Sequence, residues 1–144
     1  MKKILVTGGL GFIGSHTVVE LQNSGYEVVI IDNLSNSRIE VLESITSISG
    51  MKPSYFNIDL RNKIAVQDFF QNNQVDGIIH FAASKAVGES VQNPLLYYEN
   101  NISTLVYLLQ EMKKHQLNKF IFSSSCTVYG QADELPITEN APLK

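Results

Sequence analysis

The chain has few of the residues that would tie it to an oxidising compartment, a membrane or a nucleic acid. One cysteine, Cys126, occurs in 144 residues, so no internal disulfide bond can form, which fits a reducing cytoplasm. No apolar run approaches the roughly 18 residues of a membrane-spanning helix. The 11 basic residues are scattered and stand against 14 acidic ones, which argues against a nucleic-acid partner.

What is present describes one ordinary globular domain. Hydrophobic residues make up 44% of the chain and charged residues 17%, which are the proportions of a soluble globular protein. The length of 144 residues suits a single domain. No internal repeat, low-complexity segment or linker divides the chain. We therefore predict one domain over residues 1–144, and we expect no metal site.

The most informative stretch is a glycine cluster near the start of the chain. An apolar run at residues 4–6 is typical of a buried strand in a parallel sheet. Gly8, Gly11 and Gly14 follow it at intervals of three residues. Gly8 permits a tight turn, Gly11 lets backbone amides approach a diphosphate, and Gly14 lets the next helix pack closely. A plain glycine turn has the same pattern, so the surrounding sequence must decide between the two.

Asp32 supplies that context. Residues 13–21 have the apolar spacing of a helix, and residues 27–31 form a β-branched run that ends at Asp32. The carboxylate can accept hydrogen bonds from both ribose hydroxyls of an adenosine and would repel a 2′-phosphate, so it predicts NAD rather than NADP. Its alternative role is that of a helix-capping or loop carboxylate. The polar loop 33–37 could wrap the adenosine, or simply cap a helix expected over about residues 38–48.

Two further strands are expected at residues 54–58 and 75–83, with a helix over 62–72 between them. That helix is expected to turn Ile64, Phe69 and Phe70 toward the core. Asp59 follows the first of these strands, where it could bind the amino group of an adenine or cap the helix. Small residues end the second strand and would let a cofactor pass over the edge of the sheet. Lys85, just beyond, could pair with a phosphate or be a solvated surface lysine.

A long helix is predicted from Leu95 to His115. Its apolar face is wider than one contact with a sheet needs, so the helix could meet a partner subunit or lie well buried in the core. Asn100 and its neighbour Asn101 are poor helix formers, and an amide there could bind a ligand or a neighbouring loop. His80, inside an apolar strand, is expected to be a core histidine rather than a catalyst.

A fifth strand at residues 119–122 leads into Ser123, Ser124 and Ser125. No Gly-x-Ser-x-Gly elbow is present, so Ser125 is expected to hydrogen-bond a substrate rather than attack it; ordinary turn serines are the alternative. No charged neighbour in sequence would activate Cys126. Five strands alternating with helices predict an α/β fold, a doubly wound parallel sheet in the order 3-2-1-4-5, with a ligand crevice between strands 1 and 4.

Five segments form a recognisable set, at residues 7–16, 32–37, 81–90, 97–101 and 122–130. Together they resemble the UDP-glucose 4-epimerases of the extended short-chain dehydrogenase/reductase family, along essentially the whole chain. The resemblance implies a Rossmann fold whose tightly bound NAD takes a hydride from C4 of a UDP-hexose and returns it to the other face. It implies an isomerase of galactose and carbohydrate metabolism in the cytoplasm.

The resemblance also implies the residues of the site. The diphosphate of NAD is expected at Gly8, Gly11, Phe12, Ile13 and Gly14. The adenosine is expected at Asp32, Asn33, Leu34, Ser35, Asn36, Ser37, Asp59 and Leu60. The rest of the cofactor is expected along Phe81, Ala82, Ala83, Ser84, Lys85 and Asn100. The UDP-hexose is expected at Lys85, Ala86, Val87, Ser123, Ser124 and Ser125, with Ser125 as the catalytic residue that bonds the C4 hydroxyl.

One departure concerns the family's catalytic Tyr-x-x-x-Lys motif, which does not occur in the 144 residues. In the family the tyrosine removes the C4 hydroxyl proton, and the lysine lowers the tyrosine pKa and holds the nicotinamide ribose. Tyr129 is followed four residues later by Asp133, and Tyr97 and Tyr98 have no lysine at that distance either. We therefore expect an incomplete Rossmann domain that ends before the last strands and the substrate domain. It would be the N-terminal part of an epimerase, inactive by itself.

Two other functions stay open. One is another nucleotide-sugar enzyme of the same family, a dehydratase or decarboxylase; the other is a non-catalytic NAD-binding module. Dehydratases typically place an acid pair after the position of Thr127, where Val128, Tyr129 and Gly130 stand here. The expected partners are a UDP-hexose and a second copy of the chain. That copy would bind through the predicted long helix or the exposed edge of the fifth strand.

Overall fold

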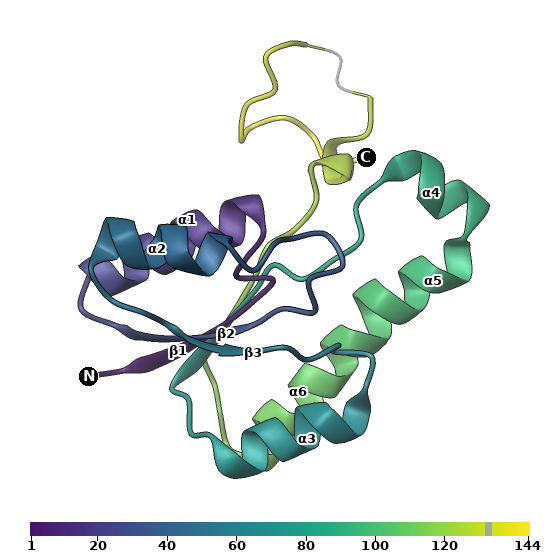
Figure 1. The fold of residues 1–144 in the computed structure, drawn as a ribbon. Helices are drawn as coiled ribbons and strands as arrows, with labels where there is room; N and C mark the ends of the chain where they lie inside the picture. Colours follow the sequence, from purple (N-terminus) through teal and green to yellow (C-terminus); the bar gives the residue numbers. More distant parts are fainter. Residues whose placement is uncertain (132–133) are drawn as a thin grey trace.

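The computed structural model describes residues 1–131 and 134–144 and contains one parallel sheet with helices on both faces (Figure 1). The strands are β1 (Lys3–Thr7), β2 (Glu27–Ile31), β3 (Ser54–Phe56), β4 (Gly77–His80) and β5 (Phe120–Phe122). The helices are α1 (Phe12–Asn23), α2 (Val41–Ser49), α3 (Lys63–Asn72), α4 (Val87–Gln92), α5 (Pro94–Tyr98), the π-helix η1 (Glu99–Ser103), α6 (Thr104–Lys114) and the 3₁₀-helix η2 (Cys126–Tyr129). The strand order is β3-β2-β1-β4-β5, which confirms the predicted order.

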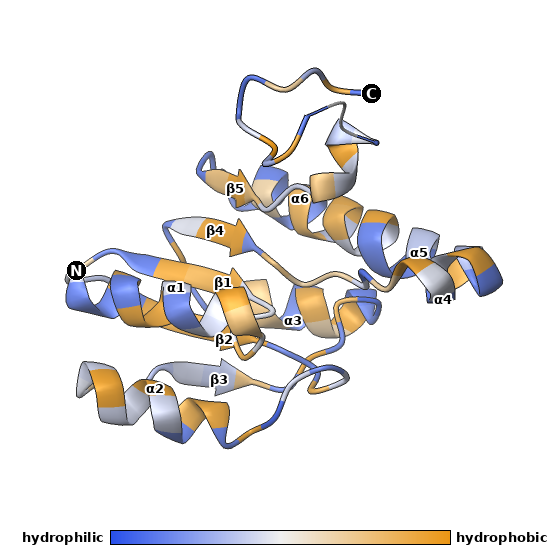
Figure 2. Cartoon of the chain, turned by 90° about the horizontal axis from the view of Figure 1, so that it is seen from above, coloured by the Kyte–Doolittle hydropathy of each residue, from blue (hydrophilic) through white to orange (hydrophobic). Residues whose placement is uncertain are grey.

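The two faces of the sheet bury two separate apolar layers, because successive side chains of a strand point to opposite faces. Val6 and Ile30 pack with Ile45 under α1 and α2, whereas Leu5 packs with Leu108 under α3 and α6. Figures 1 and 2 show these helix pairs on opposite sides of the sheet. The doubly wound architecture follows from strands that are apolar on both faces.

The strands end earlier than the sequence pattern predicts. The third predicted strand, 54–58, ends at Phe56, and the fourth, 75–83, covers only Gly77–His80. Pairing between the strands sets these limits. The ladder between β1 and β4 ends at the pair of Thr7 and His80, and its last hydrogen bond runs from the amide of Phe81 to the carbonyl of Thr7 at 3.0 Å. The residues after His80 therefore form a loop at the carboxyl edge of the sheet.

The predicted long helix is a continuous helical stretch in three parts. Residues 94–114 run through α5, η1 and α6, and the π-turn of η1 interrupts the regular spacing. Only part of its apolar face is buried: Leu108 is fully buried, whereas Leu95 is 81% exposed. The preceding helix α4 was not among the predicted elements, because its six residues carry no apolar period.

The α3 region corrects one expectation and shows which residue caps the helix. Ile64 was expected to face the core with Phe69 and Phe70, but Ile64 is 69% exposed while the two phenylalanines are buried. Asn62 caps α3 by accepting a hydrogen bond from the amide of Ala65. Within the described residues, no helix is long and apolar enough to cross a membrane.

Candidate functional site

The glycine loop between β1 and α1 is built on the left-handed backbone of Gly8. Its φ is +68°, its amide donates to the carbonyl of Ile31 at 2.8 Å, and its carbonyl accepts from the amide of Gly11 at 3.1 Å. A β-carbon at Gly8 would lie 2.8 Å from the backbone nitrogen of Ala82, beyond β4. Gly8 therefore permits both the turn and the close approach of the loop after β4.

Gly14 and Gly11 differ in what surrounds them. A β-carbon at Gly14 would overlap the carbonyl oxygen of Gly8 and lie 2.9 Å from Cα of Gly9. Gly14 thus packs α1 against the glycine loop itself rather than directly against a strand. A β-carbon at Gly11 would meet the Gly8 carbonyl at 3.2 Å and otherwise open space. Gly11 is therefore the position that leaves room for a ligand.

The N-terminus of α1 is open to an anion. Its cap, Gly11, supplies no side-chain acceptor, and the first turn as described contains no acidic residue. Phe12 and Ile13, at the start of the helix, are 80% and 55% exposed. Backbone amides and the positive end of the helix dipole together favour a phosphate group at such a terminus.

Asp32, directly after β2, ties three segments together. Its Oδ2 accepts from the amide of Leu10 in the glycine loop at 3.0 Å. Its Oδ1 accepts from the amide of Leu34 at 3.0 Å and from the hydroxyl of Ser37 at 2.7 Å. The residue is 8% exposed. The predicted cofactor residues 33–37 therefore form a loop around the carboxylate, next to the glycine loop.

Asp59 lies after β3, beside the loop that follows β2. Strand pairing brings these two ends together, since the amide of Asp32 donates to the carbonyl of Phe56 at 3.3 Å. The hydrogen bond from Arg61 holds the pKa of the Asp59 carboxyl below its usual value. The side chain of Leu60 is buried in the core, so only its backbone could meet a ligand.

The loop after β4 is anchored by two asparagines of η1. The side chain of Asn101 accepts from the amide of Ser84 and donates to its carbonyl, both at 2.8 Å. The amide of Asn100 donates to the hydroxyl of Ser84 at 2.9 Å. Both asparagines lie in the π-helix η1, and both side-chain amides reach Ser84. The expected contact between a side-chain amide and a neighbouring loop is confirmed. Asn100 binds the hydroxyl of Ser84, whereas Asn101 binds its backbone.

The remaining predicted residues lie at the same edge and are more exposed. Lys85, Ala86 and Val87 are exposed at the start of α4. Ser125 caps η2, where its hydroxyl lies 2.8 Å from that of Thr127. The segment 123–125 leaves β5 next to β4, because the amide of Ser123 donates to the carbonyl of His80 at 3.2 Å. The structure brings residues 8–14, 32–37 and 81–84 into contact, whereas the hydrogen bonds of Ser125 are made to Thr127 and Val128 of η2.

His80 is a core residue, as the sequence predicts. It is 2% exposed, its Nδ1 shares a 2.6 Å hydrogen bond with the hydroxyl of Thr7, and its ring stacks on Phe120 and Phe122. Burial lowers the pKa of His80 to about 4. The imidazole is therefore neutral near pH 7 and stabilises the sheet.

Sequence analysis did not single out two residues of this edge. Arg61 binds Asp59, and a β-carbon at Gly9 would lie 2.8 Å from the side chain of Ile30. The spacing of Asp59 and Arg61 within one turn was a usable signal, since an arginine two residues after a carboxylate can reach back to it.

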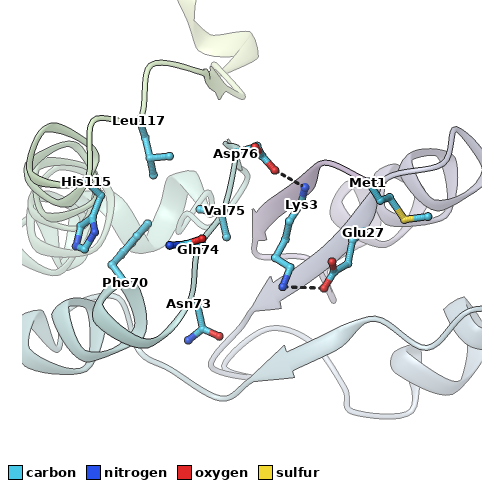
Figure 3. A pocket seen from close by; sticks show the side chains of 10 residues that line it. All are labelled: Met1, Lys3, Glu27, Phe70, Asn73, Gln74, Val75, Asp76, His115 and Leu117. Carbon is cyan, nitrogen blue, oxygen red and sulfur yellow. Dashed lines mark hydrogen bonds and ion pairs between the residues drawn. The ribbon is translucent and has the colours of Figure 1, made fainter.

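A pocket of about 430 Å³ lies at the opposite edge of the sheet (Figure 3). Lys3 starts β1 there; its backbone amide donates to Oδ2 of Asp76 at 2.7 Å, and its Nζ lies 2.8 Å from Oε1 of Glu27. Open parallel sheets bind ligands outside the carboxyl ends of their strands. Since Lys3 and Glu27 begin their strands, this pocket is distinct from the edge that carries Gly8 and Asp32.

Comparison with known proteins gives a consistent set of relatives. Residues 5–144 match the family model described as GDP-mannose 4,6 dehydratase. The chain is 51% identical over 140 residues to the UDP-glucose 4-epimerase of Bacillus subtilis, covering 97% of this chain and 41% of that protein. It is 49% identical over 141 residues to the UDP-glucose 4-epimerase of Dictyostelium discoideum, covering 98% and 41%.

Solved structures resemble the fold equally well. UDP-glucose 4-epimerase from Bifidobacterium longum, in complex with NAD+ and UDP, superposes with a TM-score of 0.91 at 48% identity, covering 99% of this chain and 43% of that one. The enzyme from Stenotrophomonas maltophila, with bound NAD and formylated UDP-arabinopyranose, has a TM-score of 0.90 at 43% identity, covering 100% and 43%. The chain spans about two-fifths of the length of the curated relatives that it matches.

Proposed function

The chain belongs to the family described as GDP-mannose 4,6 dehydratase, and from this premise we propose that it forms the NAD-binding part of a UDP-hexose 4-epimerase. The observation that carries the proposal is the joined pair of loops at the carboxyl edge of the sheet. Asp32 holds the glycine loop through Leu10 while Gly11 leaves open space beside the N-terminus of α1. That arrangement suits an adenosine on one side and a diphosphate on the other.

The residues present fit such a cofactor. The amides at the start of α1 would receive the diphosphate, Asp32 and the loop 33–37 the adenosine ribose, and Asp59 the amino group of the adenine. The loop 81–85 and Asn100 would line the nicotinamide half. When bound, the nicotinamide supplies a hydride acceptor for C4 of the sugar. The relatives crystallised with NAD, at 43% and 48% identity, support this assignment.

The proposal is tested by calorimetric titration of the chain with NAD and with NADP. NAD should bind, and NADP should bind at least about tenfold more weakly, because the Asp32 carboxylate repels a 2′-phosphate. Equal affinity for the two would contradict the role of Asp32. No heat from NAD at millimolar concentration would contradict the proposed function.

A matched variant separates binding from folding. Gly11 has a φ of −71° and a ψ of 173°, which alanine adopts freely, and its β-carbon would lie mostly in open space. Gly11→Ala should therefore lower the urea midpoint only slightly, through the contact of 3.2 Å between its β-carbon and the Gly8 carbonyl oxygen, while NAD binding weakens at least about tenfold, because the methyl group occupies the path of the diphosphate. The control is Gly88→Ala on α4, where a β-carbon meets nothing within 4 Å.

The sugar side of the site is proposed from Lys85, Ala86, Val87 and the serines 123–125. Ser125, whose hydroxyl is exposed and held by Thr127, would hydrogen-bond the C4 hydroxyl. The 144 residues contain no Tyr-x-x-x-Lys to take the C4 proton. We expect these residues alone to bind NAD without turning over UDP-galactose. Turnover near that of a full-length relative would contradict this expectation.

A dehydratase is the second candidate, and the description of the matching family favours it. Against it, Val128, Tyr129 and Gly130 stand after Thr127, where dehydratases typically have an acid pair. The curated relatives at about half identity are epimerases, which also supports the first candidate. Mass spectrometry of nucleotide sugars incubated with the protein and NAD distinguishes them, since a dehydratase releases a product that has lost water and an epimerase one of unchanged mass.

We place the protein in the cytoplasm, in keeping with its single, unpaired cysteine, and expect it to pair with a second copy. Two surfaces support pairing: β5 at the edge of the sheet, where Ile121 is 61% exposed, and α6, where Leu109 is 44% exposed. Light scattering at rising concentration should show a dimer, and Ile121→Lys or Leu109→Lys should abolish it, according to which surface is used. A strict monomer would contradict the pairing.

A further inference from the structure

Arg61 holds the Asp59 carboxylate on both of its oxygens. Its Nε lies 3.0 Å from Oδ1 and 3.1 Å from Oδ2, and its Nη2 lies 2.6 Å from Oδ2. Its backbone amide donates to Oδ1 at 2.9 Å. A planar guanidinium that meets a carboxylate in this two-pronged way sets the orientation of the group as well as its charge, which a lysine cannot do.

The Asp59 carboxylate is partly exposed to solvent, although Arg61 fixes its orientation. The Asp59 side chain is 33% exposed and that of Arg61 37%, so a ligand can reach the carboxylate from solvent. A carboxylate has about four acceptor directions, and the three N–H groups of Arg61 leave room for a further donor. An exposed ion pair of this kind contributes little to folding stability, so its geometry is better explained by a role in binding a ligand.

The pair lies where the adenosine end of the cofactor is proposed. Asp59 follows β3 and Asp32 follows β2, and these neighbouring strands end together, with Ile31 paired to Phe56. The hydrogen bond from Arg61 contributes most to lowering the pKa of Asp59, and the side chain of Asn33 in the adenosine loop contributes as well. Asp59 is therefore ionised at neutral pH and borders the loop after β2.

We infer that Arg61 is the positioning residue for recognition of the adenine base: it fixes Asp59 as an ionised acceptor for the 6-amino group. The inference rests on the proposed binding of NAD. An ionised carboxylate accepts hydrogen bonds and cannot donate one. Adenine offers an amino donor at position 6, whereas hypoxanthine has a carbonyl acceptor there. The fixed carboxylate selects the amino base and repels the carbonyl.

The test compares NAD with nicotinamide hypoxanthine dinucleotide, in which a carbonyl replaces the 6-amino group of the base and N1 carries a proton. Calorimetric titration of the wild-type chain should give at least about tenfold tighter binding of NAD. In Arg61→Met, NAD should bind about tenfold more weakly while the hypoxanthine dinucleotide stays within about twofold, so the preference collapses. Arg61→Lys keeps the positive charge but cannot make the two-pronged contact, so it should also lose most of the preference for NAD.

Two controls make the outcomes distinct. Lys52→Met removes an exposed positive charge before β3, at the opposite edge of the sheet, and should leave both affinities unchanged. Urea midpoints check that each variant is folded. Equal weakening of both dinucleotides in the Arg61 variants, or no change in either, would overturn the role of Arg61 while the proposed function stands. Failure of the wild-type chain to bind NAD would overturn the proposed function and this inference together.

Discussion

At the scale of single residues, Gly14 is the point where the glycine loop and α1 come closest. A β-carbon there would overlap the carbonyl oxygen of Gly8 and press on Cα of Gly9, and backbone atoms cannot rotate away as a side chain can. We predict that Gly14→Ala lowers the free energy of unfolding by about 2 kcal/mol and weakens NAD binding, because the loop must shift. Urea unfolding and calorimetry measure the two effects.

The control for this prediction is Gly88→Ala, since Gly88 is also helical and its β-carbon would meet no atom within 4 Å. Alanine is the better helix former, so this variant should be as stable as the wild type or more stable by up to about 1 kcal/mol. If Gly14→Ala unfolds at the same urea concentration as Gly88→Ala, the close contact between α1 and the loop does not constrain the structure.

At the scale of elements, the π-helix η1 anchors the loop that follows β4. Asn101 meets both backbone groups of Ser84, and the hydroxyl of Thr104 donates to the carbonyl of Asn100 at 2.5 Å. We predict that Asn101→Leu raises the hydrogen-exchange rate of the Ser84 amide at least about tenfold, because that amide loses its acceptor and the loop opens locally. Exchange measured by NMR follows this amide directly.

Asn72→Leu is the matched control, since Asn72 also bonds a backbone carbonyl, that of Asp68, but on the exposed surface of α3. It should leave the exchange of the Ser84 amide unchanged. Slow exchange of that amide in Asn101→Leu would mean that Asn100 alone holds the loop.

At the scale of the whole molecule, buried His80 makes stability depend on pH. Burial lowers its pKa from 6.5 to about 4, so between these values the unfolded chain takes up a proton that the folded chain does not. The contribution is complete above about pH 7 and is lost as the pH falls from 6.5 to 4, by up to about 3 kcal/mol. Urea unfolding at several pH values measures it.

The comparison variant is His80→Asn, which can still bond the hydroxyl of Thr7 but does not titrate. Its free energy of unfolding should fall less steeply than that of the wild type between pH 6.5 and pH 4, since carboxylates elsewhere contribute equally to both proteins. Parallel curves would mean that His80 takes up its proton in the folded chain near the usual pH.

The sequence by itself determined the order of the strands and the loops at their carboxyl ends. The strands are apolar on both faces and their crossovers are right-handed, and these two properties favour the observed strand order. Gly8 and Asp32 directly follow the ends of β1 and β2. Tertiary structure decided the rest. Arg61 became a site residue because folding placed its donors against Asp59, and folding made Ser84 the partner of Asn101. Where a strand ends depends on the neighbouring strand with which it pairs, and no local sequence pattern carries that information.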